Sequence, residues 1–188
     1  MAYLSHTRSN PSAANTTNVT STQRLFLALW PEDEVRTQLT AHTRQWRWPA
    51  GCARYLPADW HVTLHFIGNV GADQTEGIAS GADVPFQPFV LKLDQPQLWP
   101  HGLAVLCASG LPQPLQALYD QLAQVLHGLG LAVEARPYQP HVTLARRAGA
   151  AAPPTACAPV LWQAHGYALV VSTGDREQRY RVIRQYRR

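Results

Sequence analysis

Two segments of the sequence repeat the same pattern of chemically active side chains. Residues 57–64 read PADWHVTL and residues 137–144 read PYQPHVTL, and the two segments are identical at five of eight positions. Side chains two residues apart on a strand project from the same face of a sheet. The pattern therefore predicts that His61 and Thr63 share one face, and that His141 and Thr143 do the same in the second copy.

This duplicated His-x-Thr pattern favours chemistry on a phosphate ester. Histidine titrates near neutral pH, so one imidazole can take a proton from water while the other gives a proton to a leaving oxygen. Threonine hydroxyls can donate hydrogen bonds to phosphoryl oxygens. If the two copies pair about a pseudo-twofold axis, all four side chains converge on one cleft. The alternative is that both histidines are buried and bonded to the backbone, and the duplication argues against it.

A third histidine lies close to the first motif. Strict alternation places His65 on the same face as His61, where it either contacts substrate or lies at the rim without a role. On a strand this four-residue spacing separates the two rings by about 13 Å, which is too far for one zinc ion. No acidic third ligand lies nearby in a recognisable motif, so we predict no metal site.

The residues resemble the two-histidine phosphoesterase superfamily, which is marked by two His-x-Thr/Ser motifs. More narrowly, the sequence is similar to the bacterial and archaeal RNA 2′,3′-cyclic phosphodiesterases, also called 2′-5′ RNA ligases. The pattern Arg-x-Phe-x-Ala-Leu matches residues 24–29, His-x-Thr-Leu-x-Phe-x-Gly matches residues 61–68, and Pro-His-x-Thr-Leu-Ala-Arg matches residues 140–146. The resemblance covers residues 24–186 and is most specific in these three segments.

The resemblance implies a reaction and a role for each site residue. The reaction is metal-independent hydrolysis of a terminal RNA 2′,3′-cyclic phosphate to a 2′-phosphate, without a cofactor, and reversible 2′-5′ joining of RNA ends is also associated with the family. His61 is implied as the proton donor to the departing 3′ oxygen, and His141 as the acceptor that activates water. Thr63, Thr143 and Arg146 are implied to bind the phosphate. The residues alone require one acid and one base without saying which is which.

Arg146 raises a geometric question. Strict alternation from His141 points Arg146 to the opposite face, so a phosphate-binding role requires a bulge or twist at Ala145. Otherwise Arg146 serves another purpose, and Arg147, which falls on the His141 face, could substitute.

Two other functions remain open at this stage. A phosphodiesterase acting on 2′-5′ oligonucleotides or small cyclic nucleotides would need the same cleft chemistry, which contacts only phosphate and ribose. A non-catalytic RNA-binding module would use the histidines only to hold phosphate.

The elements that must position these residues mix strands and helices without strict alternation, which is typical of the α+β class. Apolar runs and turn residues predict helices near residues 31–46, 73–79 and 112–129, the last with a continuous apolar stripe. They predict strands at residues 25–29, 52–56, 61–67, 86–93, 103–108 and 141–146, a loop at 148–159, and a hairpin of 167–172 with 180–185. With the resemblance, we expect a bilobal, internally duplicated fold in which two antiparallel sheets face each other across a central cleft, with helices on the outside.

Composition sets the wider limits. The 188 residues carry a net charge of +4, with Lys92 as the one lysine, and this charge permits an anionic substrate. Residues 1–22 are polar and predict a disordered tail, so we expect residues 23–188 to form one bilobal phosphoesterase domain. No apolar run reaches the roughly 20 residues of a membrane helix. The three separated cysteines favour a reducing cytoplasm, and we expect a monomer that acts on RNA ends.

Overall fold

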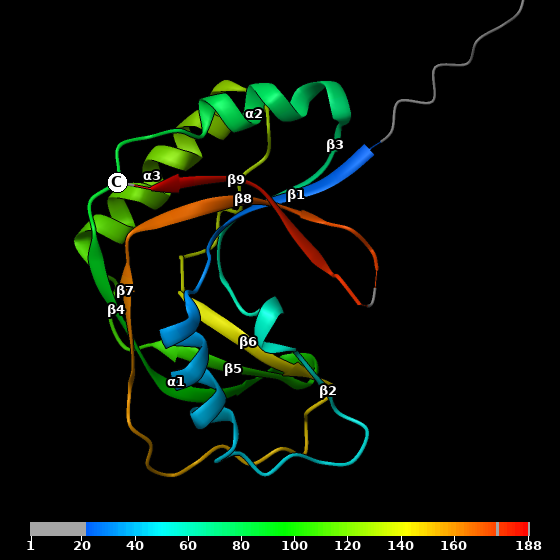
Figure 1. Cartoon of the computed structure of the whole chain (residues 1–188), viewed down its shortest axis with the longest axis vertical. Helices are drawn as coiled ribbons and strands as arrows, with labels where there is room; N and C mark the ends of the chain where they lie inside the picture. Colours follow the sequence, from blue (N-terminus) through cyan, green and yellow to red (C-terminus); the bar gives the residue numbers. More distant parts are fainter. Residues whose placement is uncertain (1–21, 176, 188) are drawn as a thin grey trace, which may run out of the picture.

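The computed structural model describes residues 22–175 and 177–187, in which antiparallel strands curl round a central space and the helices pack on the sheet (Figure 1). The strands are β1 (Thr22–Leu29), β2 (Ala53–Arg54), β3 (Val62–Gly71), β4 (Phe89–Trp99), β5 (Leu103–Ala108), β6 (His141–Arg146), β7 (Val160–Ala164), β8 (Gly166–Ser172) and β9 (Tyr180–Arg187). The helices are α1 (Asp33–Thr43), α2 (Thr75–Gly81) and α3 (Gln113–Gly128), with short 3₁₀ turns at Pro57–Asp59, Ala72–Gln74 and Pro100–Gly102.

The strands form one strongly curled sheet in the order β7-β4-β5-β6-β3-β1-β8-β9, with β2 added beside β6. Its two halves, β7-β4-β5-β6 and β3-β1-β8-β9, meet at a single residue pair, Val62 with Val142. We expected two separate sheets facing each other. The hydrogen-bonded pair between β3 and β6 instead makes the sheet continuous, and the sharp curl brings the halves round a common space (Figure 1).

Each helix contacts strands that are distant from it in sequence. Helix α1 packs against β7, where the Gln38 side chain donates to the carbonyl of Leu161 at 3.4 Å and accepts from its N–H at 2.9 Å. Helix α3 packs against β3. Its predicted apolar stripe is confirmed by Leu115, Leu118, Leu122 and Leu126, which are all fully buried.

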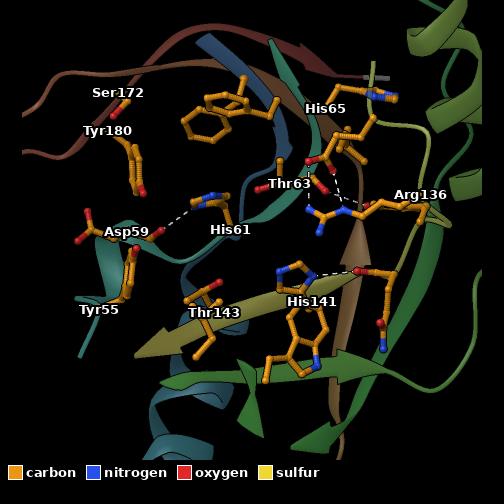
Figure 2. A pocket seen from close by; sticks show the side chains of 18 of the residues that line it. Tyr55, Asp59, His61, Thr63, His65, Arg136, His141, Thr143, Ser172 and Tyr180 are labelled. Atoms are coloured by element: carbon orange, nitrogen blue, oxygen red, sulfur yellow. Dashed lines mark hydrogen bonds and ion pairs between the residues drawn. The ribbon is translucent and has the colours of Figure 1, made fainter. Parts of the chain in front are cut away.

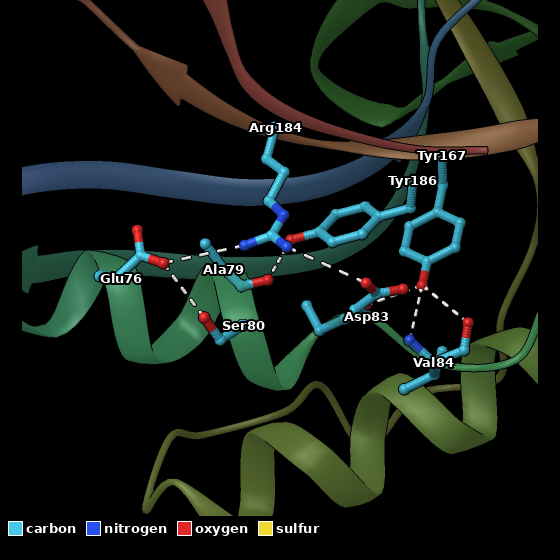
Figure 3. A network of polar contacts seen from close by, with 9 residues as sticks. Glu76, Ala79, Ser80, Asp83, Val84, Tyr167, Arg184 and Tyr186 are labelled. Atoms are coloured by element: carbon cyan, nitrogen blue, oxygen red, sulfur yellow. Dashed lines mark hydrogen bonds and ion pairs between the residues drawn. The ribbon is translucent and has the colours of Figure 1, made fainter.

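Helix α2 is held against the C-terminal strands by two buried tyrosines (Figure 3). The Tyr186 hydroxyl donates to the carbonyl of Ala79 at 2.7 Å, and the Tyr167 hydroxyl donates to the carbonyl of Ala82 at 2.7 Å. The Ala79 carbonyl lies in the last turn of α2, where a helix leaves carbonyls without an internal partner, and the Tyr186 hydroxyl satisfies it. The Ala82 carbonyl also accepts from the Val84 N–H at 3.1 Å, so the Tyr167 hydroxyl adds a second bond there. Arg184 adds ion pairs to Glu76 at 3.8 Å and to Asp83 at 4.0 Å.

Strand β1 lies in the middle of its half of the sheet and is buried on both faces. Leu25, Leu27 and Leu29 enter the main core, whereas Phe26 and Ala28 pack on the other face with residues of β8. Burying each of these leucines contributes about 1.5–3 kcal/mol. Strand β1 therefore fixes the position of its neighbour β3, which carries the first His-x-Thr motif.

Several predicted boundaries need correction. Thr22 begins β1, so the predicted tail of residues 1–22 is wrong at its last residue, and residues 1–21 lie outside the described residues. The strand predicted at residues 61–67, with Gly68 as its end signal, instead runs from Val62 to Gly71, because Gly68, with φ +88°, stays in register beside Leu25 after a bulge at Ile67. The strand predicted at residues 52–56 is only two residues long.

The predicted hairpin near the C-terminus is confirmed as β8 and β9, and the loop at 148–159 contains no helix or extended strand. The sequence did not predict β7, an edge strand that follows this loop. Within the described residues, no helix is long and apolar enough to cross a membrane. The cysteines at positions 52, 107 and 157 are all free thiols.

Candidate active site

The pairing of Val62 with Val142 brings the two His-x-Thr motifs together. In an antiparallel pair, the residues on either side of a paired position lie opposite each other. This register places His61 across from Thr143 and Thr63 across from His141, with all four side chains on the same side of the sheet. Figure 2 shows these four side chains facing a common space.

That space is a cleft of about 720 Å³. The five residues predicted to form the site all line it: His61, Thr63, His141, Thr143 and Arg146. The positions of these side chains therefore agree with the prediction that they line one cleft. Their individual roles remain proposals.

Both histidines are oriented by the same backbone contact. The Nδ1 atom of His61 lies 2.7 Å from the carbonyl oxygen of Asp59, and Nδ1 of His141 lies 2.8 Å from that of Gln139. A carbonyl oxygen can only accept a hydrogen bond, so each Nδ1 carries the hydrogen and donates it. The Nε2 atom of each ring is consequently the position that exchanges protons.

Burial lowers the pKa of both rings. For His61 the pKa falls to about 4, mainly because the ring is removed from water, and the positive charges of His141 and Arg36 lower it further. The pKa of His141 is lowered by burial and by Arg136, against the bond to the Gln139 carbonyl, which raises it. Near neutral pH both Nε2 atoms are therefore unprotonated, and a bound anion would favour their protonation.

Aromatic rings fix the two imidazoles from the sides. The His61 ring stacks on Trp30, with ring centroids 5.7 Å apart, and lies 4.9 Å from Phe26 and 5.0 Å from Tyr180. The His141 ring lies 4.4 Å from Trp99. Packing of this kind restricts the rotation of each imidazole within the cleft.

The strands carrying the two motifs contain the same irregularity. In β3, Thr63 pairs with Ala28 and His65 pairs with Leu27, so Leu64 is an extra residue. In β6, Thr143 pairs with Val105 and Ala145 pairs with Ala104, so Leu144 is an extra residue. A bulge of this kind reverses the alternation of the side chains that follow it.

The bulge at Leu144 answers the question raised by Arg146. It lies one residue before the position where we predicted a bulge or twist, and it returns Arg146 to the cleft. Arg146 Nε donates to the Tyr55 hydroxyl at 2.7 Å. Arg147, the alternative, is exposed with φ +53° and does not line the cleft.

The matching bulge at Leu64 makes the prediction for His65 wrong. Its ring borders the cleft but turns away from the face of His61 and is only 3% exposed. Its Nε2 lies 2.8 Å from the carbonyl oxygen of Tyr119, and the two rings stack at 4.0 Å. His65 therefore anchors β3 to helix α3 and does not act as a second exposed imidazole.

Sequence reasoning missed several groups around the motifs. Tyr55 follows β2 and lies under two guanidinium groups, at 5.9 Å from Arg146 and 5.0 Å from Arg179. Arg179 also forms an ion pair with the buried Asp59 at 3.7 Å, and burial raises the pKa of that carboxyl. On the other side of the cleft, Arg136 pairs with Glu134 at 2.9 Å (Figure 2). Tyr55 and Arg136 come from segments without a recognisable pattern, whereas Asp59 lies inside the first repeat at a position that differs between the two copies, and Arg179 belongs to the arginine-rich C-terminal hairpin.

Two further arginines of the hairpin form ion pairs outside the cleft: Arg184 with Glu76 and Asp83, and Arg187 with Glu32 at 3.7 Å. In residues 22–175 and 177–187 no cluster of three His, Cys, Asp or Glu side chains could hold a metal ion.

Known proteins resemble this chain in sequence and in fold. Residues 31–175 match the 2′-5′ RNA ligase superfamily. The RNA 2′,3′-cyclic phosphodiesterase of Escherichia coli (strain K12) is 36% identical over 135 residues, which are 69% of this chain and 74% of that protein. A crystal structure of a phosphoesterase has a TM-score of 0.77 at 24% identity and covers 89% of this chain and 98% of its own. The apo structure of E. coli LigT has a TM-score of 0.75 at 24% identity, with 88% and 97% covered. The structural matches establish the fold.

Proposed function

This chain belongs to the 2′-5′ RNA ligase superfamily, and we propose that it hydrolyses the terminal 2′,3′-cyclic phosphate of RNA to a 2′-phosphate. The observation that carries the proposal is the antiparallel pair Val62–Val142, which interleaves two histidines and two threonines around one cleft. The related E. coli protein is named for activity on an RNA 2′,3′-cyclic phosphate. Sequence likeness and cleft chemistry thus support the same reaction.

In the proposed reaction, a water oxygen attacks phosphorus and the bond from phosphorus to the 3′ oxygen breaks. His141 Nε2 takes the proton that water loses, and His61 Nε2 gives a proton to the departing 3′ oxygen. The products are a 3′-hydroxyl and a 2′-phosphate, and solvent restores the starting protonation of both rings. The same steps with the 5′-hydroxyl of a second RNA end in place of water join the two ends through a 2′-5′ linkage, and their reversal cleaves that linkage to give the cyclic phosphate again.

The acid role of His61 requires an anionic ligand. Its pKa of about 4 leaves it mostly unprotonated near neutral pH. A phosphodiester carries a negative charge, and its approach to Nε2 raises the imidazole pKa toward the range in which the ring can donate. The proposed assignment therefore couples the proton on His61 to substrate binding.

The remaining site residues stabilise the phosphoryl group. Thr63 and Thr143 stand beside the two histidines and donate hydrogen bonds to the non-bridging oxygens. Arg146, with its Nε held by Tyr55, directs its two terminal nitrogens toward the negative charge that grows in the transition state.

We also infer that the two halves of the sheet arose by duplication and form two lobes. In each half a strand, a helix and a His-x-Thr strand follow one another: β1, α1 and β3 in one, β5, α3 and β6 in the other. Both His-x-Thr strands carry the same bulge and the same histidine–carbonyl bond. We infer further that residues 23–188 act as one monomeric domain in the cytoplasm, a setting compatible with the free cysteines.

The test is to incubate the protein with an RNA oligonucleotide that ends in a 2′,3′-cyclic phosphate, in EDTA, and to separate 2′-phosphate from 3′-phosphate products. We expect a 2′-phosphate product that is lost in His61→Ala and in His141→Ala. His165→Ala, which removes an exposed imidazole outside the cleft, is the matched control and should keep full activity.

Other outcomes point to other functions. Loss of activity in EDTA would overturn the metal-free reaction. Binding of the RNA without turnover would indicate an RNA-binding module. Turnover of small cyclic nucleotides or 2′-5′ oligonucleotides alone would indicate a phosphodiesterase with a different substrate.

A further inference from the structure

The cleft continues past the two histidines to an end that the proposed reaction does not use. Arg24, Phe66 and Ser172 line this end. They belong to three adjacent strands, because β1 pairs with β3 on one side and with β8 on the other. Arg24 pairs directly with Ser172, and paired residues of an antiparallel sheet present their side chains on the same face. A guanidinium, a phenyl ring and a hydroxyl are thus gathered at one place.

Phe66 is the exposed aromatic residue of this group. The bulge at Leu64 turns Phe66 toward the cleft, and its side chain is 42% exposed. It occupies the position in the first half that Arg146 occupies in the second, since each lies three residues after the threonine of its motif. An exposed phenyl ring in a phosphate-binding cleft offers a stacking surface for a nucleobase.

Arg24 supplies a positive charge next to that ring. Its guanidinium lies 4.8 Å from the centroid of the Phe66 ring, and the residue is exposed. Arg24 shares a face of β1 with Phe26, whose ring lies 4.9 Å from His61. Two residues along a strand span roughly 7 Å. The charge of Arg24 therefore lies next to the reaction centre along the cleft, at the place of a neighbouring nucleotide.

We propose that Arg24, Phe66 and Ser172 form a subsite for the nucleotide on the 5′ side of the terminal cyclic phosphate. The base of this nucleotide stacks on Phe66, Arg24 pairs with the phosphate that links it to the terminal nucleotide, and the Ser172 hydroxyl bonds to a sugar or phosphate oxygen. The inference rests on the proposed function. It makes an RNA chain of two or more nucleotides a better substrate than a free nucleoside 2′,3′-cyclic phosphate.

The test compares two substrates that end in the same reacting group. One is adenosine 2′,3′-cyclic phosphate, and the other is the dinucleotide ApA with a 2′,3′-cyclic phosphate at its end. We expect the wild-type protein to show a higher kcat/KM on the dinucleotide. Phe66→Ala and Arg24→Gln should each reduce kcat/KM on the dinucleotide on the order of 10-fold, as expected for loss of one stacked base or one charge contact. Neither substitution should change kcat/KM on the mononucleotide.

Matched variants separate the subsite from general effects on the fold. Leu161→Ala removes an exposed apolar side chain of β7, and Arg181→Gln removes an exposed arginine of β9. Both variants should keep the wild-type kcat/KM on the mononucleotide and on the dinucleotide. Phe66→Leu keeps an apolar side chain without an aromatic face, and it should lose the dinucleotide preference as Phe66→Ala does.

Equal kcat/KM of the wild type on both substrates would overturn the subsite, as would a Phe66→Ala variant that slows both substrates alike. If neither substrate is hydrolysed, the proposed function fails. A binding measurement then tests the subsite independently of catalysis. Calorimetric titration with ApA ending in a 2′-phosphate should show affinity that falls about 10-fold in Phe66→Ala. An unchanged affinity would refute the subsite.

Discussion

The low pKa of His61 makes the stability of the protein depend on pH in a way that one substitution removes. An imidazole of an unfolded chain titrates near 6.5, whereas burial in the fold lowers the pKa of His61 to about 4. Between these values the unfolded chain binds a proton that the folded protein does not bind, so stability is complete above pH 6.5 and is lost as the pH falls. Protonation of this one imidazole in the unfolded chain therefore makes the free energy of unfolding about 2.5 kcal/mol lower at pH 4.5 than at pH 7.5.

The measurement is urea denaturation followed by tryptophan fluorescence at pH 7.5 and pH 4.5. Wild-type protein should lose up to about 2.5 kcal/mol more free energy of unfolding between these pH values than His61→Gln does. Carboxylates and the other buried histidines, His42 and His65 among them, titrate in both proteins, so their contributions cancel in the comparison.

His165→Gln is the control for this experiment, because it removes an exposed imidazole from the turn between β7 and β8. Between pH 7.5 and pH 4.5, this variant should lose as much free energy of unfolding as the wild type does. If His61→Gln loses as much stability in acid as the wild type, within about 0.5 kcal/mol, His61 is not held in its neutral form by burial. The proposed coupling of the proton on His61 to substrate binding, which depends on this lowered pKa, would then be refuted.

Three further predictions concern the reaction itself. Because burial lowers the pKa of both His61 and His141, kcat/KM should be bell-shaped with its optimum below pH 6.5, and a profile that is flat from pH 6 to 8 would contradict this. Thr143→Val should lower kcat about 10- to 1,000-fold through loss of one hydrogen-bond donor to the phosphoryl oxygens. If the substitution raises KM and leaves kcat unchanged, Thr143 binds the substrate and the transition state equally strongly, which would contradict the prediction. Tyr55→Phe deletes the acceptor that orients Arg146 and should lower kcat/KM about 5- to 10-fold; an unchanged rate, with Arg146→Ala inactive, would show that Arg146 needs no such support.

Local patterns in the sequence were sufficient for the elements whose residues bury one clear face. Helix α3 and strands β5 and β6 fall where the periodicity placed them. Strand β7 was not predicted because Val160, Leu161 and Trp162 are all apolar, so the run shows no alternation. Leu161 is exposed at the sheet edge, and only the pairing with β4 shows which face each side chain takes.

The four catalytic and phosphate-binding candidates of the two motifs were found because the motif is repeated, and repetition is visible without a structure. The bulges were not visible, because the extra residue is defined by the partner strand. The doubt over Arg146 was nevertheless a usable signal. If Arg146 required an irregular β6, the same irregularity in the repeated β3 would have turned His65 away from His61, as the structure shows. Tyr55 and Arg136 depend on tertiary packing alone.

With the proposed function and subsite, the repeated bulge accounts for how two similar halves contact different parts of one substrate. His61, Thr63 and their counterparts in β6 lie before the bulge, where the register of Val62 with Val142 makes the two halves equivalent around the phosphate. Phe66 and Arg146 lie after it, where each half is free to diverge without disturbing that register. An arginine at this position adds charge next to the phosphorus, and an aromatic ring adds a stacking surface. In the proposed reaction both halves therefore share the chemistry at the phosphate, whereas the proposed subsite assigns recognition of the RNA chain to the half that contains β1, β3 and β8.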